Sequence, residues 1–306
     1  MVVFLFAGQG AQYVGMGKDL YESFPESKAV FDKAEAVLGL DLKKRCFEGP
    51  EELLQITSVS QPAILTCSIA AFEAFKAQVK VEPQFVAGLS LGEYTALVAA
   101  GSLSLEDGLL LVKKRSEIMD AAARKNPGKM AAVLELPFDK LKAICQETGA
   151  EIANINAPGQ VVISGKAKAV EQAAKLCSEA GAKRVIELAV SGGFHSSLML
   201  EASRELRQVL DNTPVSAPLV PVVSNYTAQP EREIGEIKEN LVSQMYSSVR
   251  WEESMKFILS KGVNNFVEFG PGKVLKGILR RIDANAQVVS IEKKENILSL
   301  NKEALK

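Results

Sequence analysis

The chain has 306 residues, of which 47% are hydrophobic and 24% charged, so it can bury a large core and is not a disordered protein. Its 36 lysines and arginines nearly balance its 37 aspartates and glutamates, and the net charge of −1 gives no overall attraction to nucleic acid. The longest apolar stretches are far shorter than the roughly 20 residues that span a bilayer, and residues 1–7 lack a basic signal-peptide region, so we expect a cytoplasmic protein without membrane contact.

Short apolar runs alternate along the chain with longer segments of helical period. This alternation predicts an α/β fold, in which helices cover a mostly parallel sheet. The expected elements of the first part are a strand at residues 2–6, a helix at 58–76, a strand at 85–87, and helices at 91–100 and 105–122. The helix at 91–100 is followed by Gly101, a residue type that commonly ends helices.

The pattern changes between about residues 126 and 190. The expected order there is strand 129–135, helix 138–147, strand 151–155, strand 160–164, helix 167–180 and strand 183–188. This β-α-β-β-α-β order is that of a ferredoxin-like unit. We therefore predict a larger domain formed by residues 1–125 and 192–306, with a subdomain of residues 126–191 inserted into it. The larger domain is expected to resume with a helix at 197–210, a strand at 220–224, a helix at 251–261, a strand at 265–269 and a helix after residues 270–272.

A serine lies at the centre of a G-x-S-x-G pattern at residues 88–92, between the strand at 85–87 and the helix at 91–100. This arrangement is typical of a nucleophile elbow. Gly88 and Gly92 lack Cβ atoms where strand and helix crowd one another, so Ser90 can occupy a strained turn with its hydroxyl exposed. The same short pattern also occurs by chance in ordinary loops, so it does not identify a nucleophile by itself.

A serine hydroxyl needs a base to remove its proton, and the chain has a single histidine, His195. His195 precedes the predicted helix at 197–210, a position that suits a catalytic side chain better than a core one. The alternative is a surface histidine with no role. No acidic residue after the elbow is an evident third member of a Ser-His-Asp triad, but a backbone carbonyl could hold the imidazole instead.

The turn after the first strand, residues 8–12, contains Gly8-Gln9-Gly10. A strand followed by Gly-x-Gly is also found in dinucleotide-binding proteins, but Tyr13 stands where that fingerprint needs its third glycine. Gln9 could place an amide and backbone N–H groups beside the serine, where negative charge develops on the substrate oxygen. The turn could equally have a purely structural role.

Arg115 lies on the apolar side of the predicted helix at 105–122. At 100° per residue, Leu111 and Met119 fall within about 60° of Arg115, whereas Lys113 lies nearly opposite. Burying an unpaired guanidinium costs several kcal/mol, so we expect an anionic partner for it. That partner is either a ligand carboxylate, which suits the fork of guanidinium donors, or an Asp or Glu of the protein.

Several spaced motifs together closely resemble the malonyl-CoA:acyl carrier protein transacylase family of bacterial type II fatty-acid synthesis. They are residues 8–12, 88–94, Arg115, 154–160, 193–196 and 268–272, in this order over nearly the whole chain. The resemblance implies an α/β-hydrolase-like catalytic domain with an inserted ferredoxin-like subdomain, which agrees with the order of elements predicted above.

The resemblance also implies roles for individual residues. Ser90 would form the malonyl ester, and His195 would act as general base and then general acid. Gln9 and the Leu91 backbone N–H would form the oxyanion hole. Arg115 would bind the free malonyl carboxylate.

Two further assignments rest on the same resemblance. The backbone carbonyl of Gln244 would orient His195, which would account for the missing acid. Phe194 corresponds to the bulky residue of malonyl-selective relatives, whereas methylmalonyl-selective relatives have a small residue at this position.

The implied reaction is a ping-pong transfer from malonyl-CoA to the phosphopantetheine thiol of an acyl carrier protein. The implied partners are the carrier protein and CoA, and we expect a monomer. No metal and no redox cofactor is expected, and the four cysteines form no C-x-x-C pair of the kind that binds zinc. The alternatives are a serine esterase or thioesterase, an acyltransferase serving a polyketide synthase, and a non-catalytic module that docks a carrier protein.

Overall fold

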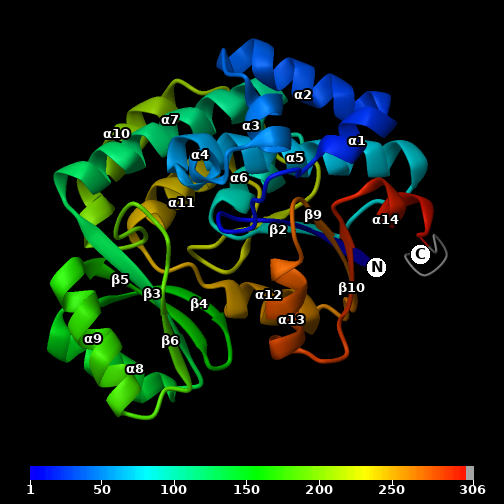
Figure 1. The fold of residues 1–306 in the computed structure, drawn as a ribbon. Coiled ribbons are helices and arrows are strands. Elements are labelled where there is room, and N and C mark those ends of the chain that lie inside the picture. The colour runs from blue at the N-terminus through cyan, green and yellow to red at the C-terminus, as the bar shows by residue number, and fades with distance from the viewer. Residues whose placement is uncertain (301–306) are drawn as a thin grey trace.

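A six-stranded sheet forms the centre of the larger part of the molecule in the computed structural model, which describes residues 1–300 (Figure 1). The strand order is β10-β9-β1-β2-β7-β8, and only β8 runs antiparallel to its neighbour. The strands are β1 (Val2–Phe6), β2 (Phe85–Gly88), β7 (Val222–Val223), β8 (Pro230–Glu231), β9 (Asn265–Phe269) and β10 (Gln287–Ile291). The predicted α/β fold with a mostly parallel sheet is confirmed.

Side chains of β1 alternate between the two faces of this sheet, and both faces are covered. Phe4 and Phe6 pack edge-on or stacked with aromatic rings of α5 and β9, with ring centroids 5.1–6.1 Å apart. Val3 and Leu5 belong to the second core on the opposite face, with Trp251 and residues of α13. A strand that is buried on both faces reads as a continuous apolar run, which is why β1 was predictable.

Helices surround the sheet (Figure 1). They are α1 (Lys18–Ser23), α2 (Pro25–Leu38), α3 (Leu42–Glu48), α4 (Glu51–Gln55), α5 (Thr57–Gln78), α6 (Leu91–Ala99), α7 (Leu105–Lys125), the 3₁₀ turn η1 (Ser197–Met199), α10 (Leu200–Asp211), α11 (Ile234–Tyr246), α12 (Trp251–Ser260), α13 (Val274–Ile282) and α14 (Lys294–Leu298). No elements were predicted from the sequence at residues 18–55, 234–246 or 287–298. The helix expected at 197–210 begins with a 3₁₀ turn, and the strand expected at 220–224 contains only Val222–Val223.

The smaller, four-stranded sheet stands beside the larger one, in green in Figure 1. Its strands β3 (Gly128–Leu134), β4 (Glu151–Ala157), β5 (Gln160–Lys166) and β6 (Arg184–Glu187) are antiparallel, in the order β4-β5-β3-β6. The helices α8 (Phe138–Thr148) and α9 (Ala167–Glu179) connect them. The β-α-β-β-α-β order is therefore present as expected, and the division of the chain at residues 126 and 191 stays a prediction.

The two faces of the smaller sheet have different neighbours. Ala131 and Val133 of β3 pack with residues of α8 and α9, whereas Met130 and Ala132 face a cavity next to the larger sheet. The first and last strands of this segment, β3 and β6, are neighbours in the sheet, and the Leu188 N–H continues their ladder by donating to the Met130 carbonyl at 2.9 Å. Because side chains alternate along β3, one face of the strand packs in the core with α8 and α9 and the other face lines the cavity. Within residues 1–300, no helix is both long enough and apolar enough to cross a bilayer.

Candidate active site

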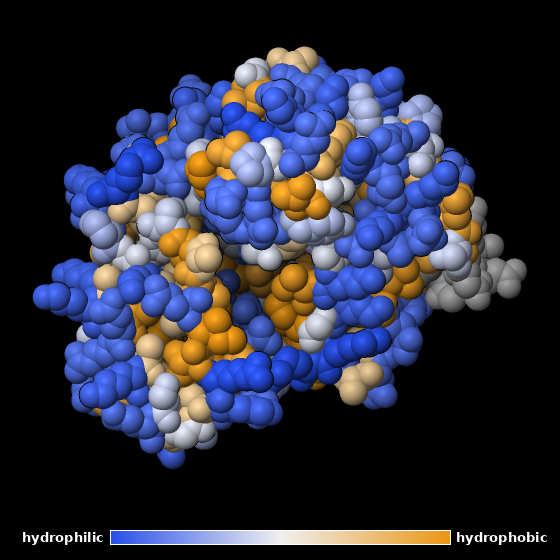
Figure 2. Space-filling model, in the orientation of Figure 1, coloured by the Kyte–Doolittle hydropathy of each residue, from blue (hydrophilic) through white to orange (hydrophobic). Residues whose placement is uncertain are grey.

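A cavity of about 410 Å³ lies between the larger sheet and the face of the smaller sheet that α8 and α9 do not cover. Figure 2 shows this hollow near the centre of the molecule, with apolar residues around it. Gln9 and Ser90 line it, and they follow the carboxyl ends of the adjacent parallel strands β1 and β2. Ligands of open α/β sheets bind at this edge of the sheet, so the sequence motifs and the cavity coincide.

Ser90 occupies a strained turn directly before α6. Its backbone has φ 52° and ψ −99°, a region that residues other than glycine rarely adopt. A Cβ on Gly88 would lie 2.0 Å from the Gly92 carbonyl carbon, and a Cβ on Gly92 would lie 2.2 Å from the Phe6 carbonyl oxygen. Both glycines are therefore required for the close approach of strand and helix that presents the serine.

Three buried polar side chains hold this turn. The Asn225 Oδ1 accepts from the Ser90 N–H at 2.6 Å, and its Nδ2 donates to the Gly88 carbonyl at 2.8 Å. The Gln244 Nε2 donates to the Ser90 carbonyl at 3.0 Å and to Glu93 Oε2 at 2.7 Å. Burial raises the pKa of Glu93 to about 7, against the effect of the hydrogen bonds from Gln244 and Asn225. The strained backbone is thus fixed by specific hydrogen bonds.

Ser90 and His195 form a hydrogen-bonded pair. The Ser90 Oγ lies 2.8 Å from His195 Nε2, and His195 Nδ1 lies 2.8 Å from the Gln244 carbonyl oxygen. A carbonyl oxygen only accepts hydrogen bonds, so Nδ1 carries the proton and Nε2 is left to accept from the serine hydroxyl. Arg115 Nη2 donates to the same Ser90 Oγ at 3.1 Å, which leaves the hydroxyl proton directed at the imidazole.

The loop that carries His195 is tied to two helices. Ser191 Oγ donates to Asp120 Oδ1 at 3.0 Å and lies 3.1 Å from Thr57 Oγ1. Ser196 Oγ donates to the Gly193 carbonyl at 2.6 Å. His195 itself has φ 55° and is buried. The base is therefore held by its neighbours in the loop in a conformation that a free chain seldom adopts.

Burial and the nearby Arg115 charge lower the pKa of His195 to about 4. A lowered pKa means that the imidazole stays neutral, and able to accept a proton, from neutral pH down to about pH 5. We expect the acylation rate of Ser90 to be flat between pH 5 and 8 and to fall at lower pH with a midpoint near 4. Single-turnover acylation followed by mass spectrometry, with circular dichroism at each pH, measures this profile; a midpoint near the ordinary histidine value of 6.5 would contradict it.

Arg115 is fully buried on α7 and has neutral partners. Its Nη1 donates to Gln61 Oε1 at 2.7 Å, and its Nη2 donates to Gln244 Oε1 and to Ser90 Oγ, both at 3.1 Å. The guanidinium also stands 4.9 Å from the centre of the Tyr94 ring. No ion pair of Arg115 with an Asp or Glu occurs in the described part of the chain, so of the two partners left open by the sequence, the internal carboxylate is absent there. A buried positive charge therefore stands beside the nucleophile.

The two predicted oxyanion donors come from the turn after β1 and from the start of α6: Gln9 lines the cavity with Ser90, and Leu91 directly follows Ser90. The Gln9 side chain accepts from Gln61 Nε2 at 3.1 Å and donates to Thr57 Oγ1 at 3.4 Å. Leu91 is the first residue of α6, where backbone N–H groups have no partner within the helix. Donors at a helix start and at the adjacent turn suit a developing negative charge.

The remaining predicted site residue, Phe194, is buried and lines the cavity next to His195. Gln61, Glu93 and Asn225 were not predicted from the sequence as site residues. Asn225 contacts the elbow only through the tertiary fold, and Glu93, although it lies in the first turn of α6, is linked to Asn225 and Gln244 only in the folded chain. Gln61 lies within α5, which is buried on nearly all sides and so gives no amphipathic pattern. Residues 1–300 contain no cluster of three or more His, Cys, Asp or Glu side chains placed to hold a metal ion.

Comparison with known proteins agrees with this geometry. Residues 3–299 match the acyl transferase domain family. The malonyl CoA-acyl carrier protein transacylase of Bacillus subtilis (strain 168) is 46% identical over 301 residues, which cover 97% of this chain and 95% of the relative. The crystal structure of an acyl-carrier-protein-S-malonyltransferase from Bartonella henselae has a TM-score of 0.95 and 38% identity, with 99% of both chains covered.

A second solved structure includes a partner. It is a malonyl-transacylase in complex with its type II PKS acyl-carrier protein, with a TM-score of 0.95 and 37% identity, covering 97% of this chain and 98% of that one. Both the sequence relatives and the structures extend over essentially the full length described. The chain belongs to the malonyl CoA-acyl carrier protein transacylase family, within the acyl transferase domain family.

Proposed function

We propose that this protein moves the malonyl group from malonyl-CoA to the phosphopantetheine thiol of an acyl carrier protein, and so supplies fatty-acid elongation. The observation that carries the proposal is the buried Arg115 guanidinium, which lies 3.1 Å from Ser90 Oγ and has neutral hydrogen-bond partners. An acyl group that ends in a carboxylate, when bound to Ser90, brings a direct ion-pair partner to this cation. The names of the relatives point to the same acyl group.

In the first half-reaction, His195 Nε2 takes the Ser90 proton while the serine oxygen attacks the thioester carbonyl carbon. The negative charge on the former carbonyl oxygen is stabilised by the amide of Gln9 and the Leu91 N–H. The C–S bond then breaks, and the departing CoA sulfur takes the proton from His195. The products are the malonyl ester of Ser90 and free CoA.

The second half-reaction runs through the same groups in the opposite sense. The carrier's phosphopantetheine thiol gives its proton to His195, and the sulfur attacks the ester carbonyl carbon. The C–O bond of the ester breaks, and Ser90 regains its proton. Because the low pKa keeps His195 neutral, the base is ready for the incoming thiol at neutral pH.

The esterase alternative requires a carboxylate on the histidine ring. Here His195 Nδ1 faces the Gln244 carbonyl at 2.8 Å, so the ring is held by the backbone. A fixed carbonyl orients the imidazole without adding a negative charge. The reaction as derived needs no metal and no redox cofactor. The cytoplasmic location, the monomeric state and the preference for malonyl that is assigned to Phe194 stay predictions.

Transfer to a carrier protein tests the proposal directly. Protein incubated with malonyl-CoA and freed of it should pass its malonyl group to a phosphopantetheinylated carrier, while a carrier without the phosphopantetheine arm should leave the adduct intact. Intact-mass spectrometry of both proteins follows the transfer. A fatty-acid carrier and a polyketide carrier are compared in parallel, since a relative of the same fold binds a type II PKS carrier. An adduct that is lost only to water would contradict the proposal.

A further inference from the structure

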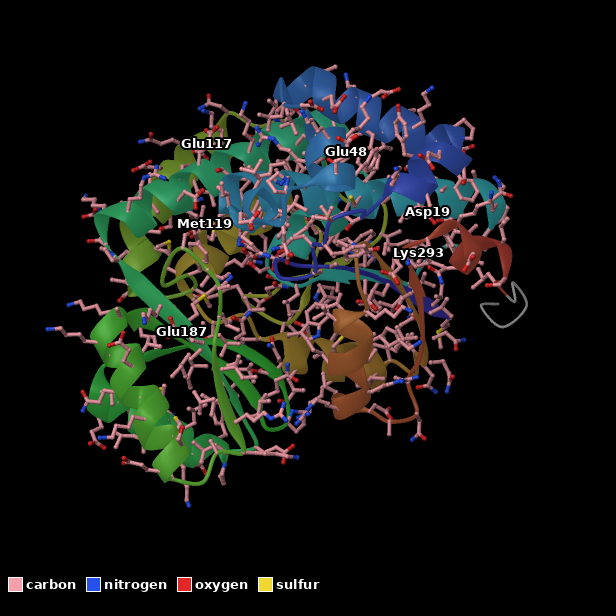
Figure 3. The ribbon with its side chains drawn as sticks, viewed as in Figure 1. Asp19, Glu48, Glu117, Met119, Glu187 and Lys293 are labelled. Carbon is pink, nitrogen blue, oxygen red and sulfur yellow. The ribbon has the colours of Figure 1, made fainter. Side chains whose placement is uncertain are left out.

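The side-chain amide of Gln61 connects Arg115, the proposed carboxylate-binding residue, with Gln9, the proposed oxyanion donor. It lies on α5 and is 1% exposed. Its Oε1 accepts from Arg115 Nη1 at 2.7 Å, and its Nε2 donates to Gln9 Oε1 at 3.1 Å. The same nitrogen lies 3.6 Å from the sulfur of Met119, which belongs to α7 and is labelled in Figure 3. The oxygen of the Gln61 amide therefore binds Arg115, and its nitrogen binds Gln9.

The order of donors and acceptors in this chain is fixed at one end. A guanidinium has only donors, so Gln61 has to present its oxygen to Arg115. Its NH₂ group then faces Gln9, which has to present its own oxygen in return. The Gln9 NH₂ group is left with one long contact, 3.4 Å to Thr57 Oγ1, and remains able to donate elsewhere.

We propose that Gln61 is a positioning residue for Gln9. Because Arg115 fixes the Gln61 amide oxygen, the Gln61 NH₂ group holds the Gln9 oxygen and leaves the Gln9 NH₂ group oriented to stabilise the oxyanion. The inference deepens the proposed function and rests on it. Gln61 touches neither the nucleophile nor its base; it acts through Gln9. Carboxylate binding at Arg115 and oxyanion stabilisation at Gln9 are then coupled by one amide.

The neutrality of Gln61 has a second effect. A glutamate at this place would pair with Arg115 and cancel the charge that a ligand carboxylate needs. The amide satisfies the same guanidinium N–H without adding a negative charge in direct contact with it. Gln244 Oε1 does the same on the other side of the guanidinium. Arg115 is thus held in place by two amides that do not compete with an anion electrostatically.

The test combines Gln61→Glu with Gln9→Ala. A glutamate at position 61 accepts hydrogen bonds at both ends, so Gln9 has to turn its NH₂ group toward it and loses its orientation. Acylation of Ser90 is measured by rapid mixing at saturating acetyl-CoA, an acyl donor without a free carboxylate, and at saturating malonyl-CoA. We expect each single variant to slow acetylation by about 10²-fold, the effect of one oxyanion donor. The double variant should be within about threefold of Gln9→Ala, because both changes remove one function.

Losses that multiply in the double variant would overturn the inference, since Gln61 would then act independently of Gln9. Gln61→Met provides a second measurement in a variant of similar shape without added charge: it frees the Gln9 amide to rotate, and its smaller loss should also vanish in the Gln9→Ala background. Gln146→Glu is the matched control, because it makes the same amide-to-carboxylate change at an exposed position of α8, away from the cavity. It should change acetylation by less than about threefold. Gln61→Glu and Gln61→Met without any loss would also contradict the inference.

The outcomes for the inference and for the proposed function are separable. If wild-type protein forms an acetyl or another acyl adduct but no malonyl adduct, the proposed function fails, and the double-variant comparison is still made with the acyl group that reacts. If malonyl is transferred as proposed and the losses multiply, the inference alone fails. If no acyl-CoA forms an adduct with the wild type, both fail.

Discussion

Replacing Ser90 by alanine abolishes the covalent acyl adduct and slows malonyl transfer by about 10⁴-fold or more. The size of this effect follows from the ping-pong route, in which every turnover passes through an ester on the Ser90 oxygen. Ser90 Oγ is also the atom on which the imidazole of His195 and the guanidinium of Arg115 converge. Intact-mass spectrometry after incubation with malonyl-CoA measures the adduct, and transfer to a phosphopantetheinylated carrier measures turnover.

The control for this variant is Ser178→Ala, which removes an exposed hydroxyl on α9 that donates within its own helix. It should acylate like the wild type. His195→Ala is expected to slow acylation severely, and adding it to Ser90→Ala should cost nothing more, since the two groups act as one unit. A malonyl adduct that persists in Ser90→Ala would place the nucleophile elsewhere. Absence of any adduct in the wild type would favour a non-catalytic module that docks a carrier.

Replacing Arg115 by alanine lowers the preference for malonyl over acetyl by about 10²-fold. Hydrogen bonds to a charged partner contribute about 1.5–3 kcal/mol each, and about 1.4 kcal/mol corresponds to a tenfold rate effect. Arg115→Lys keeps the charge but loses the fork of donors, so its preference should fall between that of the wild type and that of the alanine variant. The measurement is the ratio of the rates of Ser90 acylation by malonyl-CoA and acetyl-CoA.

The ratio is the decisive quantity because Arg115 also holds Gln61 and Gln244 in place. Loss of those contacts slows the acylation of Ser90 by both malonyl-CoA and acetyl-CoA, whereas loss of carboxylate recognition slows acylation by malonyl-CoA alone. Lys113→Ala is the control on the same helix, since Lys113 points away from the site and donates to the Leu38 carbonyl. An Arg115→Ala protein that retained the wild-type ratio would remove Arg115 from substrate recognition.

Patterns that depend on neighbouring residues were predictable from the sequence. The glycine spacing around Ser90 reflects contacts of 2.0–2.2 Å that any Cβ would make, so the elbow leaves a signature in five consecutive residues. The apolar surroundings of Arg115 follow from helical period alone. His195 could be identified because the chain has no other histidine. For Ser90 and Arg115 the physical constraint and the sequence signal lie in the same short segment, whereas His195 follows from the composition of the whole chain.

Features that depend on the meeting of distant segments were not predictable in the same way. Asn225 braces the Ser90 backbone across 135 residues of chain, and Gln61 reaches Arg115 across 54. Side-chain amides also look alike in a sequence whether they brace an active site or face solvent. The short helices α1, α3 and α4 were missed because each has only one or two buried residues and so little periodicity.

The pairing of β3 with β6, the first and last strands of the smaller sheet along the chain, brings the two chain ends of this segment together and affects how the chain folds. Ser90 and His195 are 105 residues apart, and bringing such distant groups together has an entropic cost that grows with the length of the intervening loop. The smaller sheet has its own core and lies within that loop. Once the smaller sheet has folded, the loop between Ser90 and His195 is effectively shortened to the residues before β3 and after β6. Formation of the insert therefore reduces the entropy that is lost when the nucleophile and its base come together.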